Sequence, residues 1–198
     1  GVGFMFAPMH HSAMRHAIGP RKSLGLRTVF NILGPMTNPA GVDRMLIGVY
    51  DPDLCRPVAE VLGRLGAKHA LVVHSEDGLD EISVAAPTRT VEFFDGELFE
   101  NTLYPVNFAA EADDLSGLEV DGATESLALI RAALGPEPSR DAAASKAVNM
   151  IALNAGAALY VAGVSPDLMA GVAFARQIID SGDALGRLDA LAELSQAL

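Results

Sequence analysis

The order of apolar segments in the first half of the chain is the feature that most limits its possible folds. Residues 44–50 form a short apolar run, and residues 69–74 form a second one. Between them, residues 52–66 place leucine and valine at spacings of three and four, and Gly66 follows as a helix stop. This order predicts two strands joined by a helix, which pairs the strands in parallel through a right-handed crossover.

Two further patterns complete the predicted secondary structure. Residues 81–103 alternate polar with β-branched or aromatic residues around a hairpin signal, Asp95-Gly96, so antiparallel strands are predicted there. From residue 124 onward, glycine, proline and serine breaks separate four predicted helices, with a linking turn at residues 136–138. The helices are expected at residues 124–134, 141–161, 166–180 and 183–194. The chain is therefore predicted to have an α/β fold.

Composition excludes several classes of protein. Hydrophobic residues make up 50% of the chain and the mean hydropathy is +0.28, enough to bury a large core. The most apolar stretch, residues 147–163, is broken by Asn149 and Asn154, so a buried helix is expected rather than a membrane span. The single cysteine, Cys55, and the lack of a signal-like opening favour the cytoplasm. A pI near 4.7 and 6% aromatic residues argue against general nucleic-acid binding.

The first 42 residues contain no acidic residue, although the formal net charge of the chain is -11. They carry four basic residues and three of the five histidines, whereas all 25 acidic residues lie in the rest of the chain. Surfaces that serve only solubility usually mix both signs of charge. Glycine and proline also punctuate this segment, which favours loops and short helices. The segment is therefore predicted to form a pocket for a small acidic ligand.

A second candidate site comes directly after the predicted strand at residues 69–74. Residues 75–81 place four carboxylates around a glycine, and two of them, Asp80 and Glu81, are adjacent. Ligands in open α/β sheets gather beyond the carboxyl ends of strands. Mg²⁺ often takes one or two carboxylates together with substrate phosphates and water. Asp80 and Glu81 are therefore candidate metal ligands, although an acidic, solvated turn explains the same residues.

Three groups in the opening segment are candidate ligand contacts, each with a structural alternative. Arg21 lies in a Gly-Pro loop, where its guanidinium could clamp a carboxylate or simply pair with a surface acid. His10, His11 and His16 lack the spacing of a zinc site, so an imidazole that lines the pocket or caps a helix is expected. Residues 30–39 combine Gly-Pro with Asn-Pro and form either a rigid pocket wall or a helix-terminating turn.

Several segments together resemble the anthranilate phosphoribosyltransferases of tryptophan biosynthesis. The most specific part of the resemblance is the string Arg-Thr-x-Phe-Asn-x-Leu-Gly-Pro-x-Thr-Asn-Pro at residues 27–39. The other matching segments are residues 6–16, 21–28, 78–81 and 153–163. The resemblance spans essentially the whole chain.

The resemblance implies a fold, a reaction and a set of site residues. The implied fold is the large α/β domain of the nucleoside phosphorylase-like phosphoribosyltransferases, with a central mixed sheet and flanking helices, in a homodimer. The implied reaction joins anthranilate to phosphoribosyl pyrophosphate, releases pyrophosphate and uses Mg²⁺. Arg21 matches the residue that pairs with the anthranilate carboxylate. The remaining matches are His11, Gly34 and Pro35 along the anthranilate path, and Asp80 and Glu81 as the metal-binding pair.

The sequence departs from this family in what it lacks. The family's glycine-rich diphosphate loop and most of its helical domain precede the segment that Gly1 matches, so residues 1–198 are expected to be the C-terminal part of the α/β domain. The chain alone is expected to be inactive. No catalytic acid or base is expected, because an aryl amine is already a neutral nucleophile. Two alternatives remain: a non-catalytic fragment that binds a small acid, and an enzyme like the pyrimidine nucleoside phosphorylases, against which Asp80 and Glu81 argue.

Overall fold

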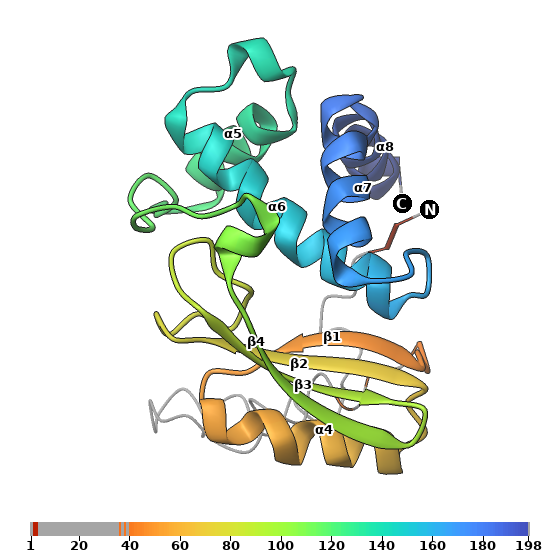
Figure 1. The fold of residues 1–198 in the computed structure, drawn as a ribbon. Helices are drawn as coiled ribbons and strands as arrows, with labels where there is room; N and C mark the ends of the chain where they lie inside the picture. Colours follow the sequence, from red (N-terminus) through yellow and green to blue (C-terminus); the bar gives the residue numbers. More distant parts are fainter. Residues whose placement is uncertain (1, 4–35, 37, 39, 198) are drawn as a thin grey trace, which may run out of the picture. The chain divides into compact units, whose positions relative to one another are not determined.

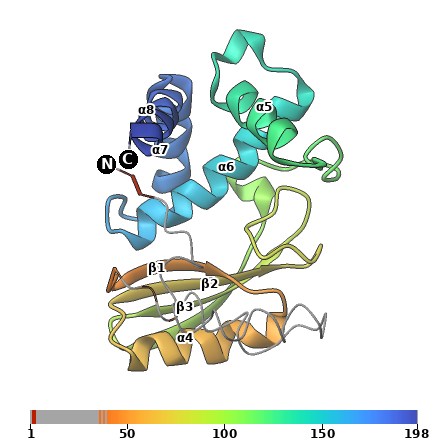
Figure 2. The same ribbon diagram turned by 180° about the vertical axis from the view of Figure 1, so that it is seen from behind.

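The computed structural model describes residues 2–3, 36, 38 and 40–197. The chain divides into two compact units, Gly1–Val42 and Asp43–Leu198. The second unit holds every helix and strand discussed below, and Figures 1 and 2 show it from opposite sides. Most of the acid-free opening segment falls outside the described residues.

A four-stranded mixed sheet forms the centre of the second unit, in the order β1-β2-β3-β4. The strands are β1 Arg44–Gly48, β2 His69–Ser75, β3 Thr88–Phe94 and β4 Glu97–Leu103. β1 pairs with β2 in parallel, whereas β3 pairs antiparallel with both β2 and β4. Every residue of β2 is buried, as expected of an inner strand covered on both faces. The predicted α/β fold with a mixed sheet is confirmed.

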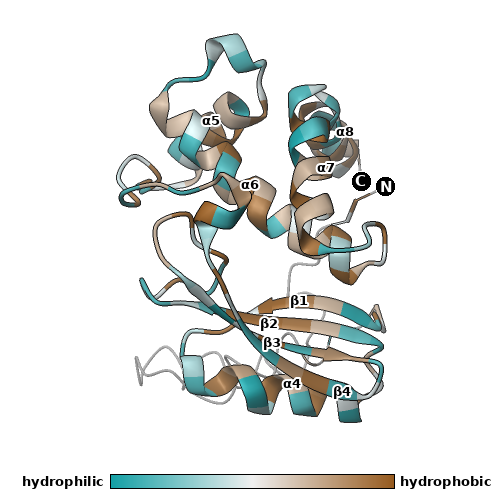
Figure 3. Ribbon diagram, viewed as in Figure 1, coloured by the Kyte–Doolittle hydropathy of each residue, from teal (hydrophilic) through white to brown (hydrophobic). Residues whose placement is uncertain are grey.

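The connection between β1 and β2 is the predicted helix. It opens with a 3-10 turn, η2 Pro52–Leu54, and continues as α4 Cys55–Arg64. α4 packs on β2 and β3, and Gly63 permits the close approach, because a Cβ there would lie 2.4 Å from the Phe93 ring. Figure 3 shows apolar and polar bands alternating along α4, as expected of a helix with one buried side. Gly66, with a φ of 98°, follows the helix as predicted.

The hairpin between β3 and β4 also agrees with the prediction. Asp95 (φ 50°) and Gly96 (φ 85°) both adopt left-handed backbone, as a two-residue hairpin turn of type I′ requires. Residues 81–87, which the alternating pattern grouped with the strands, form a loop instead. The reason is that the Ile82 and Ser83 amides donate to side chains, Asn154 Oδ1 and Thr88 Oγ1, and not to a neighbouring strand.

Four helices follow the sheet, close to the predicted positions. They are α5 Ala123–Leu134, α6 Ala142–Val161, α7 Leu168–Asp180 and α8 Asp183–Ala197. Short 3-10 turns precede α5 and α6, namely η3 Pro105–Phe108 and η4 Glu137–Ser139. α6 lies on the face of the sheet opposite α4 and packs against β1 and β2 (Figures 1 and 2). The sheet therefore has a helix on each face, and its core lies between them.

α6 and α7 meet at two glycines. A Cβ on Gly171 would lie 2.3 Å from the Gly156 carbonyl oxygen, and a Cβ on Gly156 would lie 2.5 Å from the Val172 amide nitrogen. The two helices therefore touch backbone to backbone, and apolar residues of both join the core with β2. Figure 3 shows these apolar stretches along α6 and the strands. Among the helices of the described residues, none is both long and apolar enough to cross a membrane.

Candidate metal and substrate site

The carboxyl ends of β1 and β2 lie at one edge of the sheet, and residues 76–87, here called the acidic loop, leave β2 at that edge. Beyond β1, the Val49 amide donates to the Val73 carbonyl at 2.9 Å, which keeps the two strand ends together. The backbone of Asp80 rests on Gly48, because a Cβ at Gly48 would lie only 1.5 Å from the Asp80 carbonyl oxygen. A side chain at this position would displace the loop. β1 therefore helps to position the predicted metal ligands.

Hydrogen bonds within the acidic loop give Asp77 a structural role. Its carboxylate accepts from the Ser83 hydroxyl at 2.5 Å and from the Leu79 amide at 3.3 Å. The Ser83 amide in turn donates to Thr88 Oγ1 at 3.1 Å, at the start of β3. The Asp77 carboxylate is thus hydrogen-bonded within its own loop, although Asp77 lies close in the sequence to the predicted metal ligands.

Asp80 and Glu81 differ from Asp77 in the partners of their carboxylates. Both residues are exposed, and neither side chain forms an ion pair or hydrogen bond with any residue that the structure describes. Partial desolvation raises the pKa of the Glu81 carboxyl, and the adjacent Asp80 carboxylate raises that pKa further. A divalent cation would stabilise two such neighbouring charges.

The donor set at this pair fits Mg²⁺. Within residues 40–197 and the few described residues before them, no group of three or more His, Cys, Asp or Glu side chains could hold a metal ion. A cation that needs a full cage of protein ligands therefore finds no site there. Mg²⁺ instead keeps several waters and is commonly held by one or two carboxylates plus substrate phosphates. Asp80 and Glu81 supply two carboxylates, and their exposure leaves the other coordination positions to water and phosphate.

Glu81 also lines an apolar pocket of about 470 Å³ formed by the acidic loop, residues 115–119, α5 and α6. Leu79, Leu129, Ile130 and Met150 are among the lining residues. The volume is within the range of small-molecule sites in proteins. The acidic pair therefore lies next to a pocket that could bind an apolar part of a ligand.

The residue that follows the pair is held by α6. The Asn154 side chain accepts from the Ile82 amide at 2.9 Å and donates to the Ile82 carbonyl at 2.9 Å and the Met150 carbonyl at 3.0 Å. Neither Asn154 nor Gly48 was predicted from the sequence to take part in a site. The signal for Asn154 was a polar side chain inside the most apolar stretch of the chain, whereas Gly48 gave no signal.

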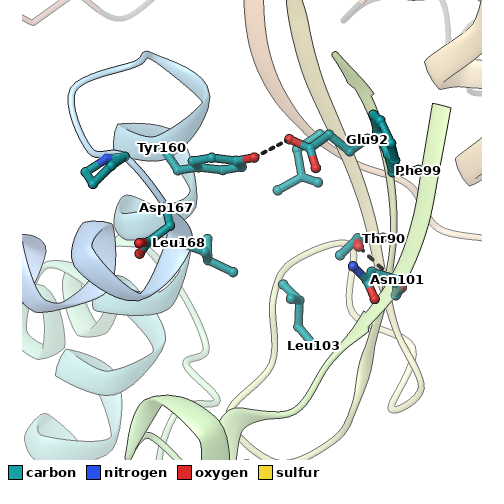
Figure 4. A pocket seen from close by; sticks show the side chains of 10 residues that line it. Thr90, Glu92, Phe99, Asn101, Leu103, Tyr160, Asp167 and Leu168 are labelled. Carbon is teal, nitrogen blue, oxygen red and sulfur yellow. Dashed lines mark hydrogen bonds between the residues drawn. The ribbon is translucent and has the colours of Figure 1, made fainter. Parts of the chain in front are cut away.

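A second carboxylate cluster lies at the opposite end of β2. Glu92 Oε1 lies 2.6 Å from His69 Nε2 and accepts from the Tyr160 hydroxyl at 2.7 Å. His69 is 2% exposed, and its ring meets the Tyr160 ring edge-on at 4.9 Å. Tyr160 and Glu92 border a pocket of about 220 Å³, together with Asp167 (Figure 4). Asp167 caps α7 by accepting from the Ala170 amide at 2.7 Å, so the carboxylates of this pocket already have partners in the protein.

The structure places Asp80 and Glu81 at the predicted edge of the sheet, and their role as metal ligands stays a prediction. The predicted anthranilate contacts Arg21, His11, Gly34 and Pro35 lie outside the described residues. Their roles also stay predictions.

Comparison with known proteins assigns the chain to a family. A sequence profile of the glycosyl transferase family, a/b domain, matches residues 1–185. The chain belongs to this family. The match includes both the acid-free opening segment and the acidic loop, so both candidate sites lie inside the domain that defines the glycosyl transferase family.

Similar members of the family include two anthranilate phosphoribosyltransferases. The protein from Marinobacter nauticus is 59% identical over 196 residues, which covers 99% of this chain and 57% of that protein. The protein from Acinetobacter baumannii is 55% identical over 198 residues, which covers 100% of this chain and 56% of that protein. The chain thus spans about half the length of the curated relatives it matches.

Solved structures of the same enzyme share this fold. The crystal structure of the Thermus thermophilus anthranilate phosphoribosyltransferase is 41% identical with a TM-score of 0.84, covering 96% of this chain and 54% of that chain. The Saccharomyces cerevisiae enzyme in complex with PRPP and Mg is 25% identical with a TM-score of 0.79, covering 95% of this chain and 53% of that chain. A further structure shows the Saccharomyces cerevisiae enzyme in complex with 4-fluoroanthranilate. The α/β fold of the chain is therefore the fold of these transferases.

Proposed function

We propose that this chain is part of an anthranilate phosphoribosyltransferase of tryptophan biosynthesis. The observation that carries the proposal is the exposed Asp80–Glu81 pair at the carboxyl edge of two parallel strands, in a chain 59% identical to such an enzyme. An enzyme like the pyrimidine nucleoside phosphorylases needs no paired metal carboxylates, so the pair favours phosphoribosyl transfer. The fold similarity to an enzyme in complex with PRPP and Mg supports the same function.

The acidic pair has one task in this function. The carboxylates of Asp80 and Glu81 hold Mg²⁺, which when bound neutralises charge on the departing diphosphate. The anthranilate nitrogen bonds to C1 of the ribose while the bond from C1 to the diphosphate oxygen breaks, and that oxygen keeps the bonding electrons. The amine then loses one proton to solvent. The protein contributes positioning and charge stabilisation, and needs no general base.

In this proposal the acid-free opening segment, residues 1–42, binds anthranilate. The Arg21 guanidinium pairs with the anthranilate carboxylate, because its planar fork matches two carboxylate oxygens. His11, Gly34 and Pro35 line the path of the aromatic ring. The support for these roles is the sequence match, which includes the segment.

The proposal extends to the whole protein. Because the chain covers 57% of the Marinobacter nauticus relative, we propose that transfer needs more of the enzyme than these 198 residues, which form the C-terminal part of its α/β domain. We also propose a homodimer in the cytoplasm, the compartment that a single cysteine favours. Purified 198-residue chain should show no turnover of anthranilate. Turnover at an ordinary enzymatic rate by that chain alone contradicts this part of the proposal.

The decisive assay follows Mg²⁺-dependent consumption of anthranilate in the presence of PRPP, using the protein as the cell makes it. Asp80→Asn and Glu81→Gln should each lower kcat/KM by about 100-fold or more, because a metal ion supplies several kcal/mol of charge stabilisation. Glu76→Gln is the matched control, since Glu76 is another exposed acid of the acidic loop, and should change kcat/KM by no more than about twofold. Full activity in the Asp80 and Glu81 variants would rule out the proposed metal role.

A second variant tests the anthranilate contact. Arg21→Lys should raise the KM for anthranilate by about 10- to 100-fold, because lysine cannot reproduce the bidentate, charge-assisted pair. Arg15→Lys, in the same acid-free segment, is the control and should leave this KM unchanged. Equal effects of the two variants would remove Arg21 from the proposed site.

A further inference from the structure

The acidic loop is held at one point by a helix that is distant in the sequence. Asn154 lies in the interior of α6, and its side-chain amide pairs with both backbone polar groups of Ile82, each at 2.9 Å. The N–H that Asn154 binds belongs to the peptide group that joins Glu81 to Ile82. The Ile82 side chain is 2% exposed and packs in the core. The backbone that carries Glu81 is therefore fixed on its C-terminal side.

The peptide group that joins Asp80 to Glu81 packs against β1. The Asp80 carbonyl oxygen lies so close to Gly48 that a Cβ there would fall 1.5 Å from it. The hydrogen bonds of Asp77 and Ser83 close the loop on itself but do not reach this part of the backbone. Asn154 and Gly48 thus contact the backbone on either side of Glu81. Glu81 and its neighbour Asp80 are exposed, and their side chains have no partner among the described residues.

We infer that Asn154 is a positioning residue for the metal-binding carboxylates, an inference that rests on the proposed function. Asparagine presents a donor and an acceptor on one short side chain, so it satisfies the N–H and the C=O of Ile82 together. Alanine leaves both buried groups unpaired, and serine is too short to reach both. Groups that orient metal ligands commonly change metal affinity by about 10- to 100-fold when they are removed.

The position of Asn154 in the helix supports the inference. Asparagine is a poor helix former in a helix interior, and the surrounding turns of α6 are apolar. A purely structural role for Asn154, which only satisfies the backbone of Ile82, predicts lower stability with unchanged metal affinity. A positioning role predicts weaker metal binding in protein that is still folded.

The test uses Mn²⁺ as a paramagnetic probe of the Mg²⁺ site, titrated in the presence of PRPP and followed by electron paramagnetic resonance. The protein is the one that the cell makes. Asn154→Ala should raise the Kd for Mn²⁺ by about 10- to 100-fold. Asn149→Ala is the matched control: Asn149 lies on the same helix, is also half-buried, and accepts from Arg176 Nη1 at 2.7 Å instead of binding the loop. Its Kd should stay within about twofold of wild type.

A second variant and a second measurement keep the test informative if Asn154→Ala does not fold. Asn154→Ser keeps a small polar residue in α6 and should weaken Mn²⁺ binding in the same way. Amide hydrogen exchange at Ile82 reports the anchor directly, and its protection should fall by about tenfold in both Asn154 variants, since the amide loses its acceptor. The Asn149 control should leave this protection unchanged.

The outcomes separate the inference from the proposed function. Weaker Mn²⁺ binding in the folded Asn154 variants, with an unchanged Asn149 control, supports the inference. An unchanged Kd in those variants overturns the inference and leaves the proposed function intact. Wild-type protein that binds no Mn²⁺ in the presence of PRPP overturns both.

Discussion

A carboxylate cluster lies at each end of β2, and the two clusters differ in what their carboxylates contact. At the first residue of the strand, one oxygen of Glu92 is shared by His69 and Tyr160. Beyond the last residue, Asp80 and Glu81 are exposed and have no side-chain partner within the described part of the chain. Asp80 and Glu81 are therefore held only through their backbone, unlike Asp77 in the same loop, whose carboxylate accepts from Ser83 and Leu79.

This difference predicts that the two ends of β2 serve different purposes, stability at one and binding at the other. A carboxylate that already accepts two hydrogen bonds has little capacity for a ligand, and removing it leaves its donors unpaired. A carboxylate held only through its backbone is free to bind a cation, at the cost of repulsion from its neighbour. The Glu92 cluster is therefore expected to stabilise the fold, and the Asp80–Glu81 pair is expected to bind.

Exchanging the two glutamates for glutamine gives the largest expected contrast. Glu81→Gln should weaken Mn²⁺ binding in the presence of PRPP by about 100-fold, since a ligand of the metal is lost, without lowering the free energy of unfolding. Glu92→Gln should lower the free energy of unfolding by about 1.5–3 kcal/mol, since hydrogen bonds to a charged group are lost, without changing metal affinity. Denaturant titration and metal titration of both variants measure the contrast. If both variants changed the free energy of unfolding and the Mn²⁺ affinity to the same extent, the distinction between the clusters would be wrong.

Gly48→Ala should weaken Mn²⁺ binding by displacing the backbone of the acidic loop. The new Cβ would lie 1.5 Å from the Asp80 carbonyl oxygen, so the acidic loop has to move. Overpacking of this kind costs about 1–3 kcal/mol in stability, and the displaced carboxylates should bind Mn²⁺ less tightly. Gly63→Ala, on α4 against the Phe93 ring, is the control that overpacks the same unit away from the loop. Equal Mn²⁺ affinity in the two variants contradicts the positioning role of β1.

Tyr160→Phe should lower the stability of the fold at the Glu92 cluster and leave the acidic pair unaffected. It removes the hydroxyl that donates to Glu92 and keeps the ring that meets His69. The expected loss is about 1 kcal/mol in the free energy of unfolding, with metal affinity unchanged. Chemical denaturation monitored by circular dichroism measures it, and a change in Mn²⁺ affinity would mean that the two ends of β2 are coupled.

Titration of Tyr160 gives the smallest predicted effect. Desolvation first, and then the hydrogen bond to Glu92, raise the pKa of Tyr160 to about 12, above its ordinary value of 10.0. The folded state therefore keeps this proton longer than the unfolded state, so the stability contribution is complete below pH 10 and is lost as the pH rises toward 12. Absorbance of tyrosinate should show a late-titrating component near pH 12 that Tyr160→Phe removes. A titration curve that Tyr160→Phe leaves unchanged at high pH contradicts the contact with Glu92.

The sequence predicted those parts of the molecule whose pattern is local. The periodicity of residues 52–66 indicated α4 because every turn of that helix has to bury its apolar side on the sheet. The Asp95-Gly96 turn was predicted for the same reason, since backbone geometry there depends on two neighbouring residues.

The parts that escaped prediction depend on contacts between distant segments. Gly48 matters because Asp80 packs on it, and Asn154 matters because Ile82 lies beside it. Asp77 could not be distinguished from its acidic neighbours in the sequence, because the difference is a hydrogen bond from Ser83 that exists only once the loop has closed.

Asp80 and Glu81 are proposed to bind the metal ion that accompanies the diphosphate substrate. The most direct measurement is anomalous diffraction from crystals of the protein, as the cell makes it, soaked with Mn²⁺ and PRPP. We expect an anomalous peak within bonding distance of carboxylate oxygens of Asp80 and Glu81. Bound PRPP with the peak beside Asp77 or Glu92, or with no peak at the pair, would contradict it.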